Sequence, residues 1–499
     1  MLLSKSCKVL IFTVVLGAFT CSQAQVQQSQ PNGLDNYLQR QMQARHIPGM
    51  QVAIVRHGKI VFDGSYGIAD LQNSVPVTRN TVFPIFSITK TFTGVAAMQL
   101  VETGKLDLEA PVSRYLDGLP LSWQSVTIRQ LLTHTSGLPN ILDNETGALI
   151  SNGERAAWEK VTAMPMEFAP GEKFSYCQTN YMLIGRIIDK LSGEAFTRFI
   201  AEKQLAIAGM KNTAYGDGHA VLPHGIRDYS LASGFKGDAS SLSGYENLFI
   251  EFSPSLLTAA GMNSTADDMA RWVIALQAVK FFKDKDSLGV LWTPGQLNDG
   301  SHQGFSTFVN GYALGWPVVL RPRHRAMAAL GGGHAAIFVY PDDDMSVILL
   351  TNLKLASPEV FVDEVVGFFI PEMKAENGFG LPPAIGALRA ELVKRGFGQA
   401  SQVVKDLKTR DASFQFAEDD LNTWAYQLLE QKRFEQAIAI FQLNVELYPH
   451  SANAYDSLAK GYEDNGNKDL AIYNYKRSLE LNPNNTNATE HLTKLHAPM

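Results

Sequence analysis

The segment Phe86-Ser87-Ile88-Thr89-Lys90 most constrains how this chain folds. An uncharged, mostly apolar run from Thr91 to Leu100 follows it, which predicts a helix that begins near Ser87. Positions three apart share a helix face, so the Lys90 ammonium would lie beside the Ser87 hydroxyl. A serine hydroxyl is a weak nucleophile until a neighbouring base takes its proton, and a desolvated lysine loses its own proton near neutral pH. The spacing therefore predicts a nucleophilic serine activated by a lysine.

Length and charge bound the class of protein. A chain of 499 residues with 45% hydrophobic residues is long enough for two or more domains with substantial cores. The net charge of -6 is mild for this length, so we expect no nucleic acid as a main partner.

The N-terminus has the pattern of an export signal. Two lysines precede an uncharged apolar run over 9–19, and the small residues Ser22 and Ala24 predict a signal peptide over 1–24. The run is too short for a membrane span, and no later stretch is long and apolar enough. Lipid anchoring through Cys21 is the alternative. We expect a periplasmic or secreted protein.

Periodicity predicts the remaining elements up to residue 370. His57-Gly58 forms a two-residue turn between two strands, and residues 215–255, rich in Gly, Ser and Asp, are expected to be irregular and close to a substrate. We predict helices over 34–44, 126–133, 181–191, 267–280 and 361–370, and strands over 50–56, 59–66, 335–340 and 345–351.

The chain changes character after residue 370. Residues 371–383 contain Gly and two adjacent prolines and are predicted to be a linker. Beyond it, Ala437, Phe441 and Pro449 recur 34 positions later as Ala471, Tyr475 and Pro483. This period predicts two tetratricopeptide repeats over 418–495, joined to the linker by a helical connector over 384–417. Such repeats suit a protein or peptide partner, and a plain helical extension is the alternative.

A second chemical group stands at Tyr176, between a Pro-Gly turn and an apolar helix. A phenol close to a lysine ammonium has a lowered pKa and acts as a general base, so we expect Tyr176 and Lys90 to share the base role. The neighbouring Cys177 is the only cysteine of the mature chain, so no internal disulfide forms. We interpret Cys177 as a small, half-buried residue rather than as a nucleophile.

These motifs resemble the serine beta-lactamase-related family, which includes class C beta-lactamases, DD-peptidases of the same fold and several esterases. The resemblance covers residues 34–370. It rests on Ser87-x-x-Lys90, on Tyr176 and on Thr-Ile-Arg-Gln-Leu-Leu-Thr-His-Thr-Ser-Gly-Leu-Pro at 127–139. It implies an α+β fold, with an antiparallel sheet flanked by helices and a helical subdomain. It also implies that Ser87 is the acylated nucleophile and that Lys90 and Tyr176 belong to the first and second motifs.

Two departures from the family pattern concern substrate binding. Gln178 stands where the second motif usually has Asn, and it keeps an amide one carbon further out. Leu330 is placed where the third motif usually has a basic residue, while Gly332 and Gly333 remain. In the family the amide at Gly333 would join that of Ser87 in the oxyanion hole. Losing the basic residue weakens binding of a substrate carboxylate.

Three histidines are further candidates near the motifs. His334 or His324 could supply the missing positive charge, but a turn or surface histidine is the favoured interpretation of both. In a strand, His334 would lie on the same face as Leu330, about 13 Å along. His134 lies in the Thr-His-Thr-Ser-Gly turn, where we expect a structural, capping role.

The sequence therefore favours an exported serine hydrolase that forms an acyl-enzyme on a small ester, amide or peptide, with weak beta-lactamase activity. We expect no cofactor and no metal, because the acidic run at 342–344 suits a solvated hairpin loop. The rival hypothesis is a catalytically decayed binding protein that works through its repeats.

Overall fold

The computed structural model describes residues 33–144, 146–232, 242–411 and 414–495. The predicted signal peptide lies outside these residues. Within them, no helix combines the length and the apolar character that crossing a membrane requires.

An eight-stranded antiparallel sheet organises residues 49–351, with the order β3-β2-β1-β13-β12-β11-β10-β9. Its central strand β13 is buried along its whole length, which explains its continuous apolar sequence. Positive φ angles at His57 and Gly58 form the predicted turn between β1 and β2. The strands are β1 (Gly49–Arg56), β2 (Lys59–Asp70), β3 (Val75–Pro76), β9 (Gly311–Tyr312), β10 (Pro317–Val319), β11 (Ala326–Gly331), β12 (Ala335–Tyr340) and β13 (Met345–Thr351).

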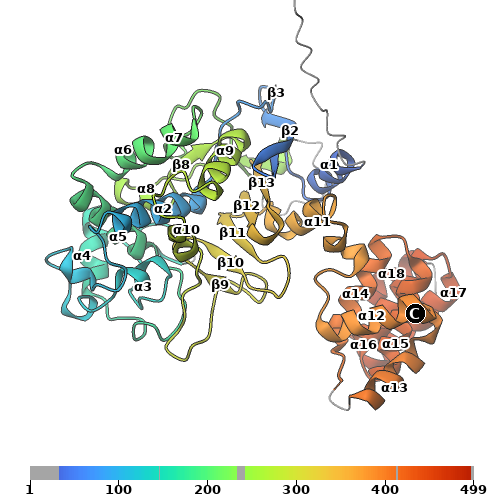
Figure 1. The fold of residues 1–499 in the computed structure, drawn as a ribbon. Helices are drawn as coiled ribbons and strands as arrows, with labels where there is room; N and C mark the ends of the chain where they lie inside the picture. Colours follow the sequence, from blue (N-terminus) through green and yellow to red (C-terminus); the bar gives the residue numbers. More distant parts are fainter. Residues whose placement is uncertain (1–32, 145, 233–241, 412–413, 496–499) are drawn as a thin grey trace, which may run out of the picture.

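Helices cover both faces of this sheet (Figure 1). On one face, α2 (Thr89–Glu102), α5 (Gln178–Ser192) and α9 (Ala266–Gln277) share a core with side chains of β1, β11, β12 and β13. On the other face, α1 (Leu34–Ala44) and α11 (Val362–Gly367) pack against the alternate side chains of the same strands. Helix α2 is buried on nearly all sides, which accounts for the uncharged run after Lys90.

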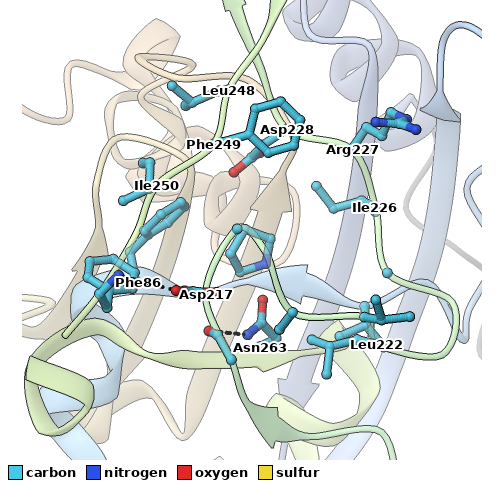
Figure 2. Close-up of a pocket in the computed structure, with 18 of the residues that line it drawn as sticks. Phe86, Asp217, Leu222, Ile226, Arg227, Asp228, Leu248, Phe249, Ile250 and Asn263 are labelled. Atoms are coloured by element: carbon cyan, nitrogen blue, oxygen red, sulfur yellow. Dashed lines mark hydrogen bonds between the residues drawn. The ribbon is translucent and has the colours of Figure 1, made fainter. Parts of the chain in front are cut away.

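Short elements complete this part of the chain. The described residues of 215–255, which are 215–232 and 242–255, are largely irregular, as predicted, and several of them line a cavity beside Phe86 (Figure 2). The short helices are α3 (Ile128–Leu132), α4 (Glu154–Ala163), α6 (Phe196–Ile200), α7 (Ala206–Ala208), α8 (Leu257–Ala260) and α10 (Asp286–Leu291). The short strands are β4 (Phe83–Pro84), β5 (Ala214–Tyr215), β6 (Tyr229–Leu231), β7 (Tyr245–Asn247) and β8 (Met262–Ser264).

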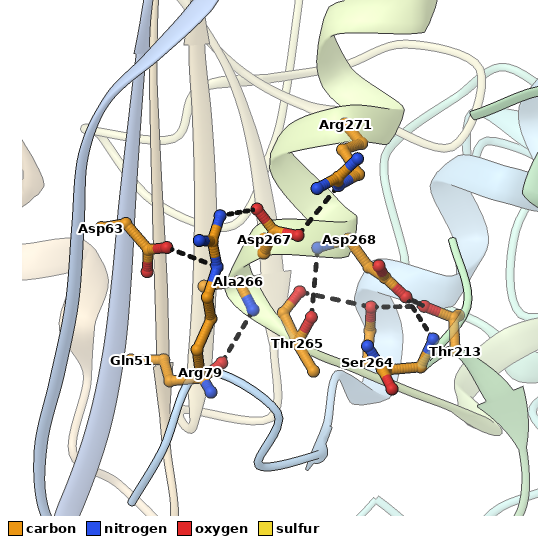
Figure 3. A network of polar contacts seen from close by, with 11 residues as sticks. Gln51, Asp63, Arg79, Thr213, Ser264, Thr265, Ala266, Asp267, Asp268 and Arg271 are labelled. Carbon is orange, nitrogen blue, oxygen red and sulfur yellow. Dashed lines mark hydrogen bonds and ion pairs between the residues drawn. The ribbon is translucent and has the colours of Figure 1, made fainter. Parts of the chain in front are cut away.

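A polar network joins β1 and β2 to the segment that precedes α9 (Figure 3). The Gln51 side chain accepts the Ala266 N–H at 2.8 Å. Arg79 forms ion pairs with Asp63 at 2.8 Å and with Asp267 at 2.6 Å. These contacts fix the start of α9 against the sheet, and with it the β8 segment that runs beside Phe83.

The chain from residue 383 onward consists of helices packed in antiparallel pairs (Figure 1). Ala437 and Ala471, 34 residues apart, are both fully buried, and so are Phe441 and Tyr475. The predicted linker forms two short turns, in which Met373 is buried against α11. The helices are α12 (Pro383–Arg395), α13 (Ala400–Arg410), α14 (Glu418–Glu430), α15 (Phe434–Leu447), α16 (Ala452–Asp464), α17 (Lys468–Leu481) and α18 (Thr486–Lys494).

Candidate active site

The backbone turns sharply immediately before Ser87. Phe86 has a φ of 44°, a left-handed conformation that costs a non-glycine residue about 1–2 kcal/mol. Two contacts hold it in place: the Ile85 N–H donates to the Met262 carbonyl at 3.0 Å, and the Phe86 ring lies 4.5 Å from that of His334. Ser87 then stands in a single helical turn that leads directly into α2. Such strain persists only where the surrounding structure imposes it, and it gathers at functional sites.

Lys90 lies one turn along, as the spacing predicts. Its Nζ is 3.5 Å from the Ser87 Oγ and donates to the Ala259 carbonyl at 2.9 Å. The side chain is fully buried, and this burial lowers the pKa of Lys90 well below its usual range. Burial therefore favours the uncharged amine, whose lone pair can take a proton from Ser87.

Tyr176 completes the cluster, but its predicted pKa was wrong. The Lys90 Nζ lies 4.7 Å from the centre of the Tyr176 ring, and the side chains of Ser87 and Gln178 act to lower the pKa of the phenol. Burial nevertheless raises the pKa of Tyr176 to about 12. The expectation assumed a lysine ammonium beside the phenol, whereas burial disfavours the charged form of Lys90 and also the ionised form of the phenol. Tyr176 keeps its proton at neutral pH.

Aromatic side chains fix the loop that carries Tyr176. His134 is fully buried, and its Nδ1 accepts the Cys177 N–H at 3.1 Å. Its ring lies 4.4 Å from that of Tyr176 and 4.8 Å from that of Tyr312. The structural interpretation of His134 agrees with these contacts. Cys177 is a packing residue as expected, but it is fully buried rather than half-buried. No sequence signal indicated Tyr312, because β9 is only two residues long.

The third-motif strand corrects the assignment of Leu330. In β11, Ala329 belongs to the core that contains α2 and α5, whereas Leu330 packs in the core on the opposite face. Gly331 returns to the Ser87 side, where a Cβ would meet the Ile85 carbonyl oxygen at 2.4 Å. Leu330 therefore does not occupy the place of a basic residue that faces the nucleophile. The β11 residues on that side are Ala329 and Gly331, and neither carries a charge.

Gly332 and Gly333 form a tight turn after β11. Both have positive φ, at 57° and 74°, and the His334 N–H donates to the Gly331 carbonyl at 2.8 Å. A Cβ on Gly332 would lie 3.4 Å from the Phe86 ring, so this turn packs against the residue before Ser87. Gly333 packs closest to Leu355. The role of Gly333 in an oxyanion hole stays a prediction.

Gly331→Ala tests this close approach. The added methyl group would overlap the Ile85 carbonyl, so β11 or the Ile85–Ser87 turn must move. We expect the free energy of unfolding to fall by about 1–3 kcal/mol and ester hydrolysis to fall about 10²-fold. Chemical denaturation and initial rates measure the two effects. Gly386→Ala is the control: its Cβ would meet nothing within 4 Å in helix α12, so unchanged activity and up to about 1 kcal/mol of added stability are expected. Equal effects of both variants would contradict the packing argument.

Neither candidate histidine supplies a positive charge near Ser87. His324 contacts two carboxylates, Asp343 at 2.8 Å and Glu372 at 2.7 Å. His334 lies in the turn rather than in one strand with Leu330, so the predicted 13 Å separation along a strand was wrong. Burial lowers the pKa of His334 to about 4, and the ring is neutral at physiological pH.

The acidic run at 342–344 is held by ion pairs. Its three carboxylates contact Arg325, His324 and His57. Among the residues that the structure describes, no group of His, Cys, Asp and Glu side chains is arranged to hold a metal ion.

An antiparallel sheet with a helical subdomain, and a serine and a lysine at the start of a buried helix between them, are the architecture of penicillin-recognising serine enzymes. Residues 34–366, about two thirds of the chain, match the Beta-lactamase family, and the chain belongs to that family. Members of this family are hydrolases.

Two curated relatives and one solved structure illustrate the similarity. Protein flp of Staphylococcus aureus (strain MW2) is 27% identical over 334 residues, which are 64% of this chain and 62% of that protein. Penicillin-binding protein 4* of Bacillus subtilis (strain 168) is 29% identical over 59% of this chain and 66% of its own length. This chain thus spans somewhat less than two thirds of either relative. The octameric penicillin-binding protein homologue from Pyrococcus abyssi shares the fold, with a TM-score of 0.57 and 24% identity over 71% of this chain and 80% of that one.

Proposed function

We propose that this protein is an exported serine hydrolase that forms an acyl-enzyme at Ser87 and acts on an ester or amide without a free carboxylate. The observation that carries the proposal is the position of the buried Lys90, whose pKa is lowered by burial: its Nζ is 3.5 Å from the Ser87 Oγ and close to the protonated Tyr176. A nucleophile, a base and an acid thus stand together at one helix start.

Acylation follows from these protonation states. The Ser87 Oγ attacks the substrate carbonyl carbon while its proton passes to the Lys90 Nζ. When the tetrahedral intermediate collapses, the bond to the leaving group breaks and Tyr176 donates its phenolic proton to that group. The Lys90 ammonium then returns a proton to the Tyr176 oxygen. The start of α2, a helix of 14 residues, favours the negative charge that develops on the substrate oxygen.

Water completes the cycle. It attacks the acyl carbonyl carbon and gives one proton to Lys90, and the acid product leaves as the Ser87 Oγ regains a proton from that ammonium. The same residues therefore serve both half-reactions in opposite directions.

The substrate class rests on charge. The β11 residues on the Ser87 side, Ala329 and Gly331, offer no cation, and His334 is neutral at physiological pH. A substrate carboxylate would have no cationic partner in this strand, whereas a neutral acyl group needs no such partner to bind. The Gln178 Oε1, at the start of α5, is buried and has no hydrogen-bond partner among the described residues, and we propose it as a contact for such a substrate.

A hydrolysis panel on the mature protein tests this selectivity. We expect p-nitrophenyl butyrate to be hydrolysed at least about tenfold more efficiently than mono-p-nitrophenyl succinate, which differs by a terminal carboxylate. Nitrocefin and D-amino-acid peptides with a free carboxyl terminus should be poor substrates. A fluorophosphonate should label Ser87, as peptide mapping by mass spectrometry would reveal. A preference for the succinate would contradict the charge argument, and labelling elsewhere would contradict the nucleophile.

For residues 418–495 we propose two tetratricopeptide repeats that bind a peptide or a protein. The support is the 34-residue correspondence of buried positions, Ala437 with Ala471 and Phe441 with Tyr475. Helices α12 and α13 share a core with α14 and α15 and would serve as the third helix pair of the stack. If Ser87 reacts with no probe and no substrate, the binding protein becomes the better proposal.

A further inference from the structure

A cavity of about 400 Å³ lies directly beside the nucleophile (Figure 2). Phe86, the residue before Ser87, forms part of its lining, and so does Ala260, next to the carbonyl that Lys90 contacts. The rest of the lining is mixed: apolar side chains such as Leu222, Ile226 and Phe249 stand beside polar ones such as Asp217, Asp228 and Asn263. Its position and size suit one side chain of a substrate whose carbonyl group lies at Ser87.

One carboxylate in this lining lacks a hydrogen-bond donor. The Asp228 side chain is 11% exposed, and its Oδ1 has no hydrogen-bond partner among the described residues. Figure 2 shows Asp228 at the rim of the lining, directed into the space beside Phe249 and Ile226. A buried carboxylate without a donor is costly, so the site is incomplete without one.

The nearest polar neighbour of Asp228 is another acceptor. The His334 Nδ1 contacts the Gly332 carbonyl at 3.0 Å, which places the proton on Nδ1 and leaves Nε2 with a lone pair. That Nε2 lies 3.7 Å from the Asp228 Oδ2 and has no hydrogen-bond partner either. When Asp228 is ionised, two buried acceptors thus face each other with no hydrogen-bond donor between them. A ligand that brings several N–H donors and a positive charge complements this pair.

The other charges around the cavity do not satisfy Asp228. Arg227 pairs with Asp70 at 3.2 Å, so its charge is engaged on the adjacent surface. Asp217 accepts the N–H of His219 at 3.0 Å, and Lys354, which is exposed, acts on His334 from a distance. Asp70 and Asp217 outnumber Arg227 in the lining, so its charge is negative even while Asp228 is protonated, which favours a cationic ligand over an anionic one.

We propose that this cavity is the subsite for a primary ammonium group: the substrates are amides or esters of amino acids with a free amino group, and Asp228 is the residue that selects them. The apolar side chain of the amino acid fills the space beside Phe249, and the ammonium group donates to Asp228. This inference rests on the proposed acyl-enzyme chemistry at Ser87, and its binding test does not depend on that chemistry.

Titration of Asp228 gives the subsite a pH dependence. Burial raises the pKa of Asp228 to about 8, so the empty cavity holds a largely protonated carboxyl group at neutral pH. A bound ammonium favours the ionised carboxylate, so binding should strengthen as the pH rises from about 6 to about 9, where a primary amine is still mostly protonated. The neighbouring His334 stays neutral over this range, and the Tyr229 pKa is raised by burial.

Calorimetric binding of phenethylamine, with phenethyl alcohol as its uncharged counterpart, tests the subsite. We expect the amine to bind at least about tenfold more tightly than the alcohol, and Asp228→Asn to abolish this difference. Asp217→Asn is the matched control: this carboxylate lines the same cavity but already has donors, so the preference for the amine should persist. An unchanged amine preference in Asp228→Asn, or no preference in the wild type at any pH, would overturn the proposal.

Turnover gives a second readout. The experiment compares both enantiomers of phenylalanine methyl ester with methyl 3-phenylpropionate, which lacks the amino group. We expect the kcat/KM of the better enantiomer to exceed that of the desamino ester at least about tenfold. Asp228→Asn should remove that advantage and leave hydrolysis of the desamino ester. Ser87→Ala should still bind phenethylamine. If the protein binds the amine but hydrolyses no ester, the proposed function is wrong and the ammonium subsite is supported. If it hydrolyses esters without any preference for the amino group, the proposed function is supported and the ammonium subsite is wrong.

Discussion

Ser87→Ala is expected to lower hydrolysis of p-nitrophenyl butyrate by at least about 10³-fold and to abolish covalent labelling by a fluorophosphonate. The expectation follows from the short path between Ser87 and Lys90: with the hydroxyl removed, the uncharged amine has no proton to accept and no covalent intermediate forms. Initial rates and intact-protein mass spectrometry after labelling measure the two effects.

The fold should tolerate this change. Ser87 is partly exposed, and alanine suits the helical turn that it occupies, so the free energy of unfolding should stay within about 0.5 kcal/mol of the wild-type value. Ser122→Ala, at an exposed position, is the matched control and should keep full activity and labelling. If Ser87→Ala retains ester hydrolysis and labelling, a different residue is the nucleophile and the proposed mechanism is wrong.

The sequence predicts much of this architecture because the relevant signals are local. The strands over 335–340 and 345–351 coincide with β12 and β13, since continuous apolar runs bounded by turn residues leave little choice. The helix after Ser87 was likewise recognisable from its motif and its uncharged run. This helix has no amphipathic pattern to recognise, because α2 is buried on nearly every side.

The features that were missed depend on contacts between distant segments. Which side chains of β11 face Ser87 depends on the register of this strand, and a shift of one residue would exchange the two faces. The pairing with β12 and the Gly332-Gly333 turn determine that register. Leu330 was therefore assigned to the wrong face. Asp228 gave no signal either, because its importance arises only when the fold brings it to His334, more than 100 residues along the chain.

The same reasoning explains the error over Tyr176. Proximity to a lysine predicts a lowered phenol pKa only if the lysine is charged. Burial decides the protonation of both groups here, and it moves the pKa of Lys90 down and that of Tyr176 up. Burial, rather than sequence spacing, therefore assigns the role of base to Lys90 and that of acid to Tyr176.

Lys90→Met should lower ester hydrolysis about 10³-fold while the protein remains folded, because methionine keeps the volume of the side chain and removes the base. In the wild type, kcat/KM should rise with pH as Lys90 loses its proton, well below the usual lysine pKa, and then stay level, since Tyr176 with a pKa of about 12 remains protonated. Tyr176→Phe should lower the plateau about 10²-fold and leave the rising limb in place. If instead Tyr176→Phe removes that limb and Lys90→Met preserves it, Tyr176 is the base.

Stability gives an independent measure of the same lysine. The unfolded chain keeps the Lys90 proton up to a pH of about 10.4, whereas the folded protein releases it at a much lower pH. Between these limits the unfolded state binds more protons, so the free energy of unfolding must rise with pH, by up to about 1.4 kcal/mol per pH unit from this residue. Chemical denaturation at pH about 7 and about 9 should show this rise in the wild type and its loss in Lys90→Met. Lys105→Met removes an exposed lysine that also donates to a backbone carbonyl, at 3.2 Å from Leu191, and should keep the rise. An equal rise in Lys90→Met would mean that Lys90 is charged in the folded protein, and Ser87 would then need another base.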